Sequence, residues 1–178
     1  MTTTEFLFDF GSPNSYLAWK LLPGIEKRTG VQFTYVPVLL GGIFKATGNA
    51  SPVFAFANIK GKLDYEKLEM RRFIQKHGLT AFQMNPHFPV NTLLLMRGAI
   101  FAQNKGTLPA YIAAAMHHMW EAPKKLDDPE VFVTAFEESG LDGRALLEGT
   151  QDSDVKATLI ANTENAVRRG VFGAPSFF

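Results

Sequence analysis

The sequence predicts a mixed α/β protein in which a small sheet accompanies a long all-helical stretch. The first roughly 40 residues alternate strand, helix and strand signals, and helical signals dominate from Asp64 onward. The chain ends in "VFGAPSFF", where Gly-Ala-Pro before apolar residues indicates a turn into a further strand with Pro175 at its entrance. A strand–helix–strand unit needs a right-handed crossover, so its two strands should be parallel.

The N-terminal unit follows from local patterns. Its segments are a short apolar strand, an amphipathic helix and a β-branched, aromatic strand, over Thr4–Phe10, Asn14–Thr29 and Val31–Val38. Gly30 is suited to stop the helix, because glycine readily adopts the left-handed conformation there. Pro23 and the glycine after it lie mid-helix and predict a kink or a break.

The middle of the chain changes character. Leu39–Lys62 is rich in glycine and proline and is typical of a loop with short helical pieces. Asn91, Asp128 and either Asp152 or Ser153 are suited to cap helices. Helices are predicted over Asp64–His77, Asn91–Asn104, Leu108–Glu121, Pro129 to about Ser139, Leu141–Glu148 and Ser153 to about Arg169.

Composition excludes several classes of function. The 178 residues carry a net charge of +1, which gives no electrostatic case for nucleic acid or an acidic membrane. The absence of cysteine excludes disulfides, thiolate metal sites and catalysis by the protein's own sulfur. No apolar run reaches the roughly 20 residues of a membrane helix, and the N-terminus lacks a signal-peptide pattern, so we expect a cytoplasmic protein.

Histidine spacing predicts no metal site. His77 and His87 have no partner at metal-ligand spacing. His117 and His118 are adjacent on a helix, where neighbouring side chains point apart. We therefore expect no bound metal.

The stretch "FDFGSPNSYLAW", residues 8–19, carries the candidate catalytic group. Ser12 lies at or just before a helix N-terminus, and Pro13 suits the first helical turn. Such a terminus presents unpaired N–H groups and partial positive charge, so it stabilises an anion such as a thiolate. Ser12 can donate a hydrogen bond to that anion, or it can be an ordinary N-cap, which is the commoner role of such a serine.

Five motifs in order resemble a known family. They are "FDFGSPNSYLA", "LGGIFKATGN", "KLDY", "FPVNTLLLMRG" and "GVFGAPSFF". Together they resemble the cysteine-free branch of the DsbA-like disulfide-oxidoreductase family, which holds the kappa-class glutathione transferases and the 2-hydroxychromene-2-carboxylate isomerases. Within this pair, Phe-Pro-Val-Asn-Thr favours the isomerases.

The resemblance implies a thioredoxin-like fold with a large all-helical insertion. The thioredoxin-like domain would be discontinuous, over residues 1–40 and 150–178, and the inserted helical domain would span 41–149. Because the sequence stops mid-strand at Phe178, we expect that the C-terminal part of this domain is absent from it.

The resemblance also implies that glutathione supplies the missing sulfur. Ser12 would donate to the thiolate, the backbone of Ala174 would pair with the cysteinyl part, and Pro175 would fix that loop. Asn49 and Lys62 would bind the glycyl end, and Tyr65 would pack on the ligand or hydrogen-bond it.

These assignments have alternatives. Lys60, which is followed by glycine, could equally be the family's ligand-binding lysine, and Lys62 is preferred for its distance to Tyr65. Lys45 or Lys62 could attract a substrate carboxylate. Asn49 is also a common turn residue, Lys62 a common surface lysine, and Tyr65 a residue that often buries its ring. Asn14 replaces the family's usual aromatic residue.

The leading functional hypothesis is a glutathione-dependent isomerase of aromatic catabolism. The resemblance implies reversible thiolate addition to an unsaturated aromatic pyruvate, bond rotation and elimination. The alternatives are a kappa-like transferase that conjugates glutathione to electrophiles and a non-catalytic thioredoxin-like module that binds peptides across Pro175. The first two would need glutathione and a small aromatic or electrophilic partner, and the resemblance suggests a homodimer.

Overall fold

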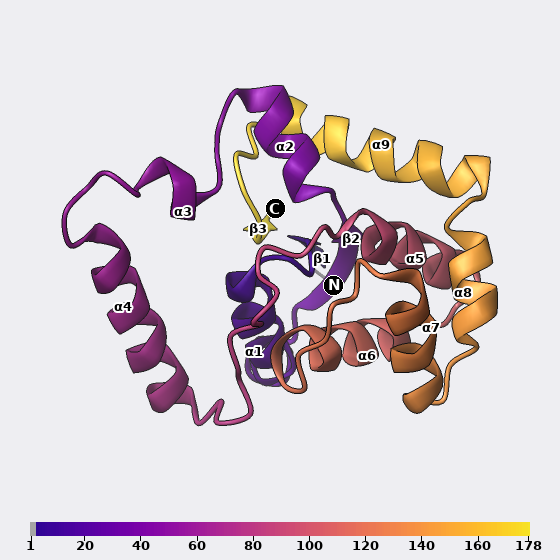
Figure 1. The fold of residues 1–178 in the computed structure, drawn as a ribbon, viewed down its shortest axis with the longest axis horizontal. Helices are drawn as coiled ribbons and strands as arrows, with labels where there is room; N and C mark the ends of the chain where they lie inside the picture. The colour runs from indigo at the N-terminus through magenta and orange to yellow at the C-terminus, as the bar shows by residue number, and fades with distance from the viewer. Residues whose placement is uncertain (1–2) are drawn as a thin grey trace.

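The described residues, 3–178, form a small three-stranded sheet surrounded by helices (Figure 1). Strand β1 (Thr3–Phe8) lies between β2 (Gln32–Pro37) and β3 (Ser176–Phe177). β1 and β2 are parallel, whereas β3 is antiparallel to β1. The parallel pair and the final strand predicted from the sequence are confirmed.

Helix α1 (Pro13–Thr29) connects the two parallel strands. Gly30 ends it in the left-handed conformation, with φ of 73°, as expected. The predicted break at Pro23 is wrong, because the helix runs through that position without interruption. Pro23 is exposed, and buried Leu22 and half-buried Ile25 pack in the core on either side of it. This packing holds the helix together despite one missing backbone donor.

An arm of helices follows β2. It contains α2 (Leu40–Thr47), the single turn α3 (Pro52–Ala55) and α4 (Lys62–His77), and Figure 1 shows α3 and α4 projecting from the body. No residue of α3 or α4 is fully buried. α4 reaches the core only through half-buried apolar side chains, which are Met70, Phe73 and Ile74. The expected loop with short helical pieces is confirmed.

Five further helices complete the body. They are α5 (Leu93–Asn104), α6 (Leu108–Trp120), α7 (Pro129–Glu138), α8 (Gly143–Gly149) and α9 (Ser153–Arg168). Each differs from its predicted bounds by one or two residues. The predicted caps Asp128 and Asp152 are confirmed, because their side-chain oxygens accept hydrogen bonds from first-turn amides. The prediction for Asn91 is off by one residue: Thr92 is the N-cap of α5, and Asn91 Oδ1 accepts from the Leu93 amide.

Strand β1 separates two hydrophobic clusters, because successive side chains of a strand point to opposite faces. Phe6 and Phe8 are fully buried in the larger cluster, together with side chains of α1, α5, α6 and α7. Leu7 belongs to the smaller cluster, with Ile43 of α2 and Ala166 of α9. The end of β1 is therefore held firmly from both sides.

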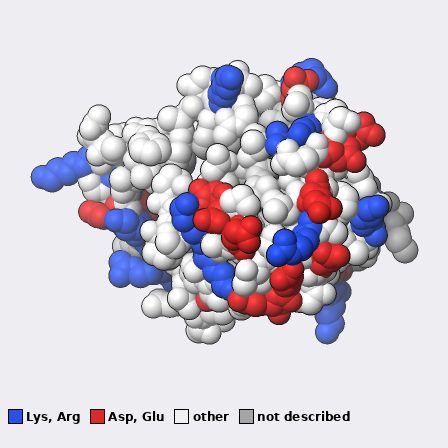
Figure 2. Space-filling view, turned by 45° about the vertical axis from the view of Figure 1, so that its right-hand side comes forward, with Lys and Arg blue, Asp and Glu red and all other residues white. Residues whose placement is uncertain are grey.

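The surface carries charges of both signs. On the face that Figure 2 shows, acidic and basic side chains lie interspersed, without a patch of one sign among the described residues. In the part of the chain that the structure describes, no helix combines the length and the apolar character needed to cross a membrane.

Candidate active site

Ser12 lies in the turn between β1 and α1 and is the N-cap of the helix. Its extended backbone (φ −93°, ψ 115°) lets Oγ accept a hydrogen bond from the amide of Ser15 at 3.2 Å. The same hydroxyl donates to the carbonyl oxygen of Ala174 at 2.8 Å, although 162 positions separate the two residues. The structure thus joins the two motifs that the sequence placed at opposite ends of the chain.

The loop before β3 completes this corner. The Ala174–Pro175 peptide bond is cis, as the resemblance implies for this loop. Within residues 3–178, the amides of Asn14 and Ala174 have no hydrogen-bond partner. Both flank Ser12, at the positive end of the α1 dipole. The corner therefore presents two N–H groups and a hydroxyl, and hydrogen-bond donors of this kind favour the charged form of an anion.

A buried carboxylate lies beneath the corner. Asp9 is completely buried, and its Oδ1 accepts from the Gly11 amide at 2.7 Å. Its Oδ2 accepts from the Leu40 amide at 2.7 Å and from the Thr92 hydroxyl at 3.0 Å. Burial raises the pKa of the Asp9 carboxyl, and the three hydrogen bonds oppose this increase. The sequence analysis missed Asp9, although a charged residue within the apolar run "FLFDF" was a usable signal.

The remaining predicted ligand residues lie on the arm. Asn49 follows the C-cap of α2 and is exposed. Lys62 begins α4, where Nζ lies 3.4 Å from Glu66 and 5.1 Å from the Phe56 ring centre. Tyr65 is 54% exposed, so its ring does not lie in a helix seam. In the described structure, no hydrogen bond, ion pair or ring contact joins these residues to the corner, and their ligand roles stay predictions.

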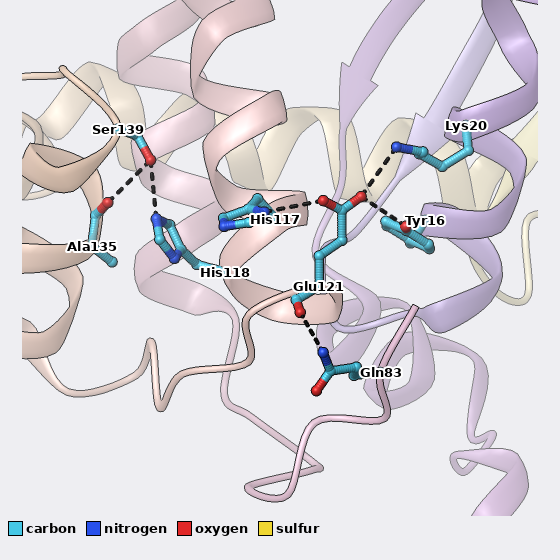
Figure 3. Close-up of polar contacts among 8 residues, drawn as sticks. All are labelled: Tyr16, Lys20, Gln83, His117, His118, Glu121, Ala135 and Ser139. Carbon is cyan, nitrogen blue, oxygen red and sulfur yellow. Dashed lines mark hydrogen bonds and ion pairs between the residues drawn. The ribbon is translucent and has the colours of Figure 1, made fainter. Parts of the chain in front are cut away.

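Glu121, at the end of α6, contacts Tyr16 and Lys20 of α1 (Figure 3). Glu121 Oε1 accepts from the Tyr16 hydroxyl at 2.8 Å and from Lys20 Nζ at 3.1 Å, while Oε2 lies 3.0 Å from His117 Nδ1. Burial alone would raise the pKa of Glu121, but hydrogen bonds from His117, Tyr16 and Lys20 outweigh it and lower the pKa. The sequence analysis also missed this carboxylate, because its partners lie on different helices.

Trp120 fixes the backbone of the corner itself. Its indole Nε1 donates to the carbonyl oxygen of Phe10 at 2.9 Å, and the whole contact is buried. The chain before α5 holds this end of α6 in turn, because the Gln83 amide donates to the Trp120 carbonyl. Phe10, Ser12 and the start of α1 are therefore positioned by residues far away in sequence.

His118 is a structural histidine. It is 3% exposed, and its Nε2 lies 3.0 Å from Ser139 Oγ, which itself donates to the Ala135 carbonyl (Figure 3). Nε2 must therefore donate, which leaves Nδ1 unprotonated and, among the described residues, without a partner. Burial, followed by electrostatic interactions with Lys124 and His117, lowers the pKa of His118. The ring is neutral near pH 7.

Comparison with known proteins agrees with this geometry. A family model for the DSBA-like thioredoxin domain matches residues 3–178. The chain belongs to this family. This DsbA-like chain contains no cysteine.

Two relatives of this DsbA-like chain match it over nearly its whole length. The 2-hydroxychromene-2-carboxylate isomerase of Sphingobium xenophagum is 29% identical over 178 residues, covering 99% of this chain and 88% of the relative. Glutathione S-transferase kappa 1 of Homo sapiens is 28% identical over 189 residues, covering 97% of this chain and 79% of the relative. Both groups named from the sequence motifs are therefore confirmed as relatives.

A solved structure supports the same grouping. The structure of a 2-hydroxychromene-2-carboxylate isomerase superposes on this DsbA-like chain with a TM-score of 0.81 at 25% identity. The match covers 99% of this chain and 85% of that structure. The predicted thioredoxin-like α/β fold is confirmed.

Proposed function

We propose that this protein is a glutathione-dependent isomerase of the 2-hydroxychromene-2-carboxylate type, acting in aromatic catabolism. The observation that carries the proposal is the contact between Ser12 and Ala174, which brings the N-terminus of α1 and the loop before β3 together in a chain without cysteine. The names of two relatives, an isomerase and a glutathione transferase, support it.

The corner's residues hold and orient the thiolate. Ser12 turns its hydroxyl from the Ala174 carbonyl to the sulfur and donates to it, which lowers the thiol pKa. The free amides of Asn14 and Ala174 add two donors, and Pro175 fixes the loop that presents Ala174. When bound, glutathione supplies a nucleophile that adds reversibly to the substrate's double bond, so that the bond can rotate before the thiol leaves.

The arm would bind the rest of the cofactor and the substrate carboxylate. Asn49 and Lys62, with Lys60 as the alternative to Lys62, take the glycyl end of glutathione, and Tyr65 contacts the same ligand. Among the described residues, the ion pair of Lys62 is with half-exposed Glu66, so its ammonium can exchange that partner for a ligand carboxylate at low cost. We further propose a cytoplasmic homodimer, with the domain division 1–40 and 150–178 against 41–149.

A kappa-like transferase is the second candidate, favoured by the similarity to human glutathione S-transferase kappa 1. It uses the same thiolate, so the corner supports both activities equally. An assay with both substrate types distinguishes the two activities: a transferase forms glutathione conjugates with electrophiles, whereas an isomerase turns over 2-hydroxychromene-2-carboxylate. A non-catalytic module that binds peptides across Pro175 predicts no affinity for glutathione.

The first test is glutathione binding, followed by ultraviolet absorbance of the thiolate across pH. We expect binding, with a thiol pKa well below that of free glutathione. Ser12→Ala should raise the bound thiol pKa and lower turnover by roughly 100-fold, the lower end of the range for the loss of one preorganised hydrogen-bond donor. Ser15→Ala is the matched control, because its hydroxyl is buried without a hydrogen-bond partner in the described structure. Equal turnover in the two variants would remove Ser12 from the mechanism.

A further inference from the structure

Asp9 is the only ionisable side chain that the described structure places within hydrogen-bond distance of the turn between β1 and α1, residues 10–12. It follows β1 by one residue and precedes Ser12 by three, and its backbone carbonyl accepts from the Ser12 amide at 3.1 Å. The carboxylate is fully buried, whereas carboxylates in proteins are mostly exposed. Burying a charged carboxylate costs free energy, so the position of Asp9 next to the proposed anion site needs an explanation.

Three elements converge on this carboxylate. The Gly11 amide belongs to the turn between β1 and α1, the Leu40 amide is that of the first residue of α2, and the Thr92 hydroxyl lies directly before α5. All three are donors, and both amide distances are 2.7 Å, which is short for N–H donors and typical of an ionised acceptor. The arrangement therefore suits the charged form of Asp9.

Glycine at position 11 belongs to the same arrangement. A Cβ there would lie 3.0 Å from Thr92 Cγ2 and 3.2 Å from Asp9 Oδ1. Both distances are tighter than ordinary van der Waals contact. The turn thus packs directly on the carboxylate and on the threonine of the Phe-Pro-Val-Asn-Thr segment.

The Asp9 carboxyl has no counterion among the described residues. None of the ion pairs among residues 3–178 includes it, and only backbone amides and a hydroxyl contact it from the turn, α2 and α5. The nearest ionisable residues along α2 and α5 are Lys45 and Arg97, and neither pairs with it. Its field therefore reaches the neighbouring anion site without a cation in between to cancel it.

We propose that Asp9 is a positioning residue whose negative charge, beneath the anion site, also limits how strongly the corner stabilises a bound thiolate. This inference rests on the proposed function, since it concerns the glutathione thiol. The helix dipole, the free amides and Ser12 all favour the thiolate, and a negative charge beneath them opposes this effect. The nucleophilicity of a thiolate falls with its pKa, so the most effective thiol has a pKa near ambient pH. Asp9 keeps the thiol in that range.

The test is the pKa of the glutathione thiol bound to Asp9→Asn, measured by ultraviolet absorbance between pH 4 and 10. Asparagine keeps an acceptor for the Gly11 amide and removes the charge. We expect the bound thiol pKa to fall by about half a unit to one unit, or roughly three- to tenfold in its ionisation constant. Loss of a purely structural contact would loosen the corner and leave this pKa unchanged or raise it, and either result would overturn the proposal.

Thr163→Val is the matched control. Thr163 Oγ1 accepts from the Leu39 amide, directly beside the amide that Asp9 binds, but it carries no charge and does not touch the turn. The control should cost stability without moving the thiol pKa. If it lowers the pKa as far as Asp9→Asn does, the charge of Asp9 is not the cause.

A second pair of variants covers the case in which Asp9→Asn does not fold. Thr92→Val removes one donor to the charged form of Asp9, which favours its neutral form, so the thiol pKa should fall by less. Thr92→Ser keeps the donor and should match the wild type. Equal thiol pKa values in the two variants would refute the proposal. Absence of glutathione binding in the wild type is a different outcome, which rejects the proposed function itself.

Discussion

The contact between Tyr16 and Glu121 gives a quantitative test of how the helical part of the chain holds α1. Tyr16→Phe removes one hydroxyl, which donates to Glu121 Oε1 at 2.8 Å. The ring contacts with Trp19 and Phe82 remain, with centroid distances of 6.2 and 5.7 Å. The substitution therefore deletes a hydrogen bond without creating a cavity.

The expected cost follows from what Glu121 retains. A hydrogen bond to a charged group contributes about 1.5–3 kcal/mol. Glu121 keeps Lys20 at 3.1 Å and His117 at 3.0 Å, so the carboxylate is not left unpaired. We therefore expect a loss at the low end, about 1.5 kcal/mol in the free energy of unfolding. For a chain of this length that corresponds to a fall of about 3–6 °C in Tm.

Urea unfolding monitored by circular dichroism at pH 7 measures this loss. Tyr35→Phe is the control, because the described structure gives the Tyr35 hydroxyl no hydrogen bond, and it should change stability by less than about 0.5 kcal/mol. If Tyr16→Phe costs no more than Tyr35→Phe, the contact does not hold α1.

A pH series adds a second check. The pKa of Glu121 is lowered in the folded state, so its contribution is complete above its ordinary value of 4.5 and is lost as the pH falls through the folded value. The difference between wild type and Tyr16→Phe should shrink below pH 4.5. A difference that stays constant down to pH 3 would mean that the charge of Glu121 plays no part.

Two further predictions concern the helical body. Gly98→Ala should lower the free energy of unfolding, measured with urea, by about 2 kcal/mol or more, because a Cβ there would collide with the buried Tyr111 side chain. Gly41→Ala is the control: its Cβ would meet open space, so the change should be neutral or slightly stabilising. Equal effects of the two substitutions would contradict this packing. The free energy of unfolding should fall as the pH drops below 6.5, because the pKa of His118 is lowered in the folded state and the unfolded chain therefore binds a proton first. His118→Gln should make stability depend less on pH in this range. An unchanged dependence in this variant would contradict the prediction.

The sequence by itself determined the elements and the likeness to the DsbA-like family. Periodicity and capping residues placed α1 and the helices from α4 onward to within a few residues, because these signals act over one or two turns. The bounds of α2 and α3 were not predicted. Ser12 and Pro175 were found for the same reason, since a cap and a strand entrance are local features. The break at Pro23 was predicted wrongly, because packing of Leu22 and Ile25 overrides a local preference.

Only the tertiary structure decided how the corner is assembled. Asp9 meets Leu40 and Thr92, Trp120 meets Phe10, and these pairs lie far apart along the chain. Burial and hydrogen bonds between distant segments leave no periodic pattern in a single sequence, so propensity cannot reveal them. They depend on how the sheet and the helices pack, and this packing brings a serine cap, the loop before β3 and a buried carboxyl together.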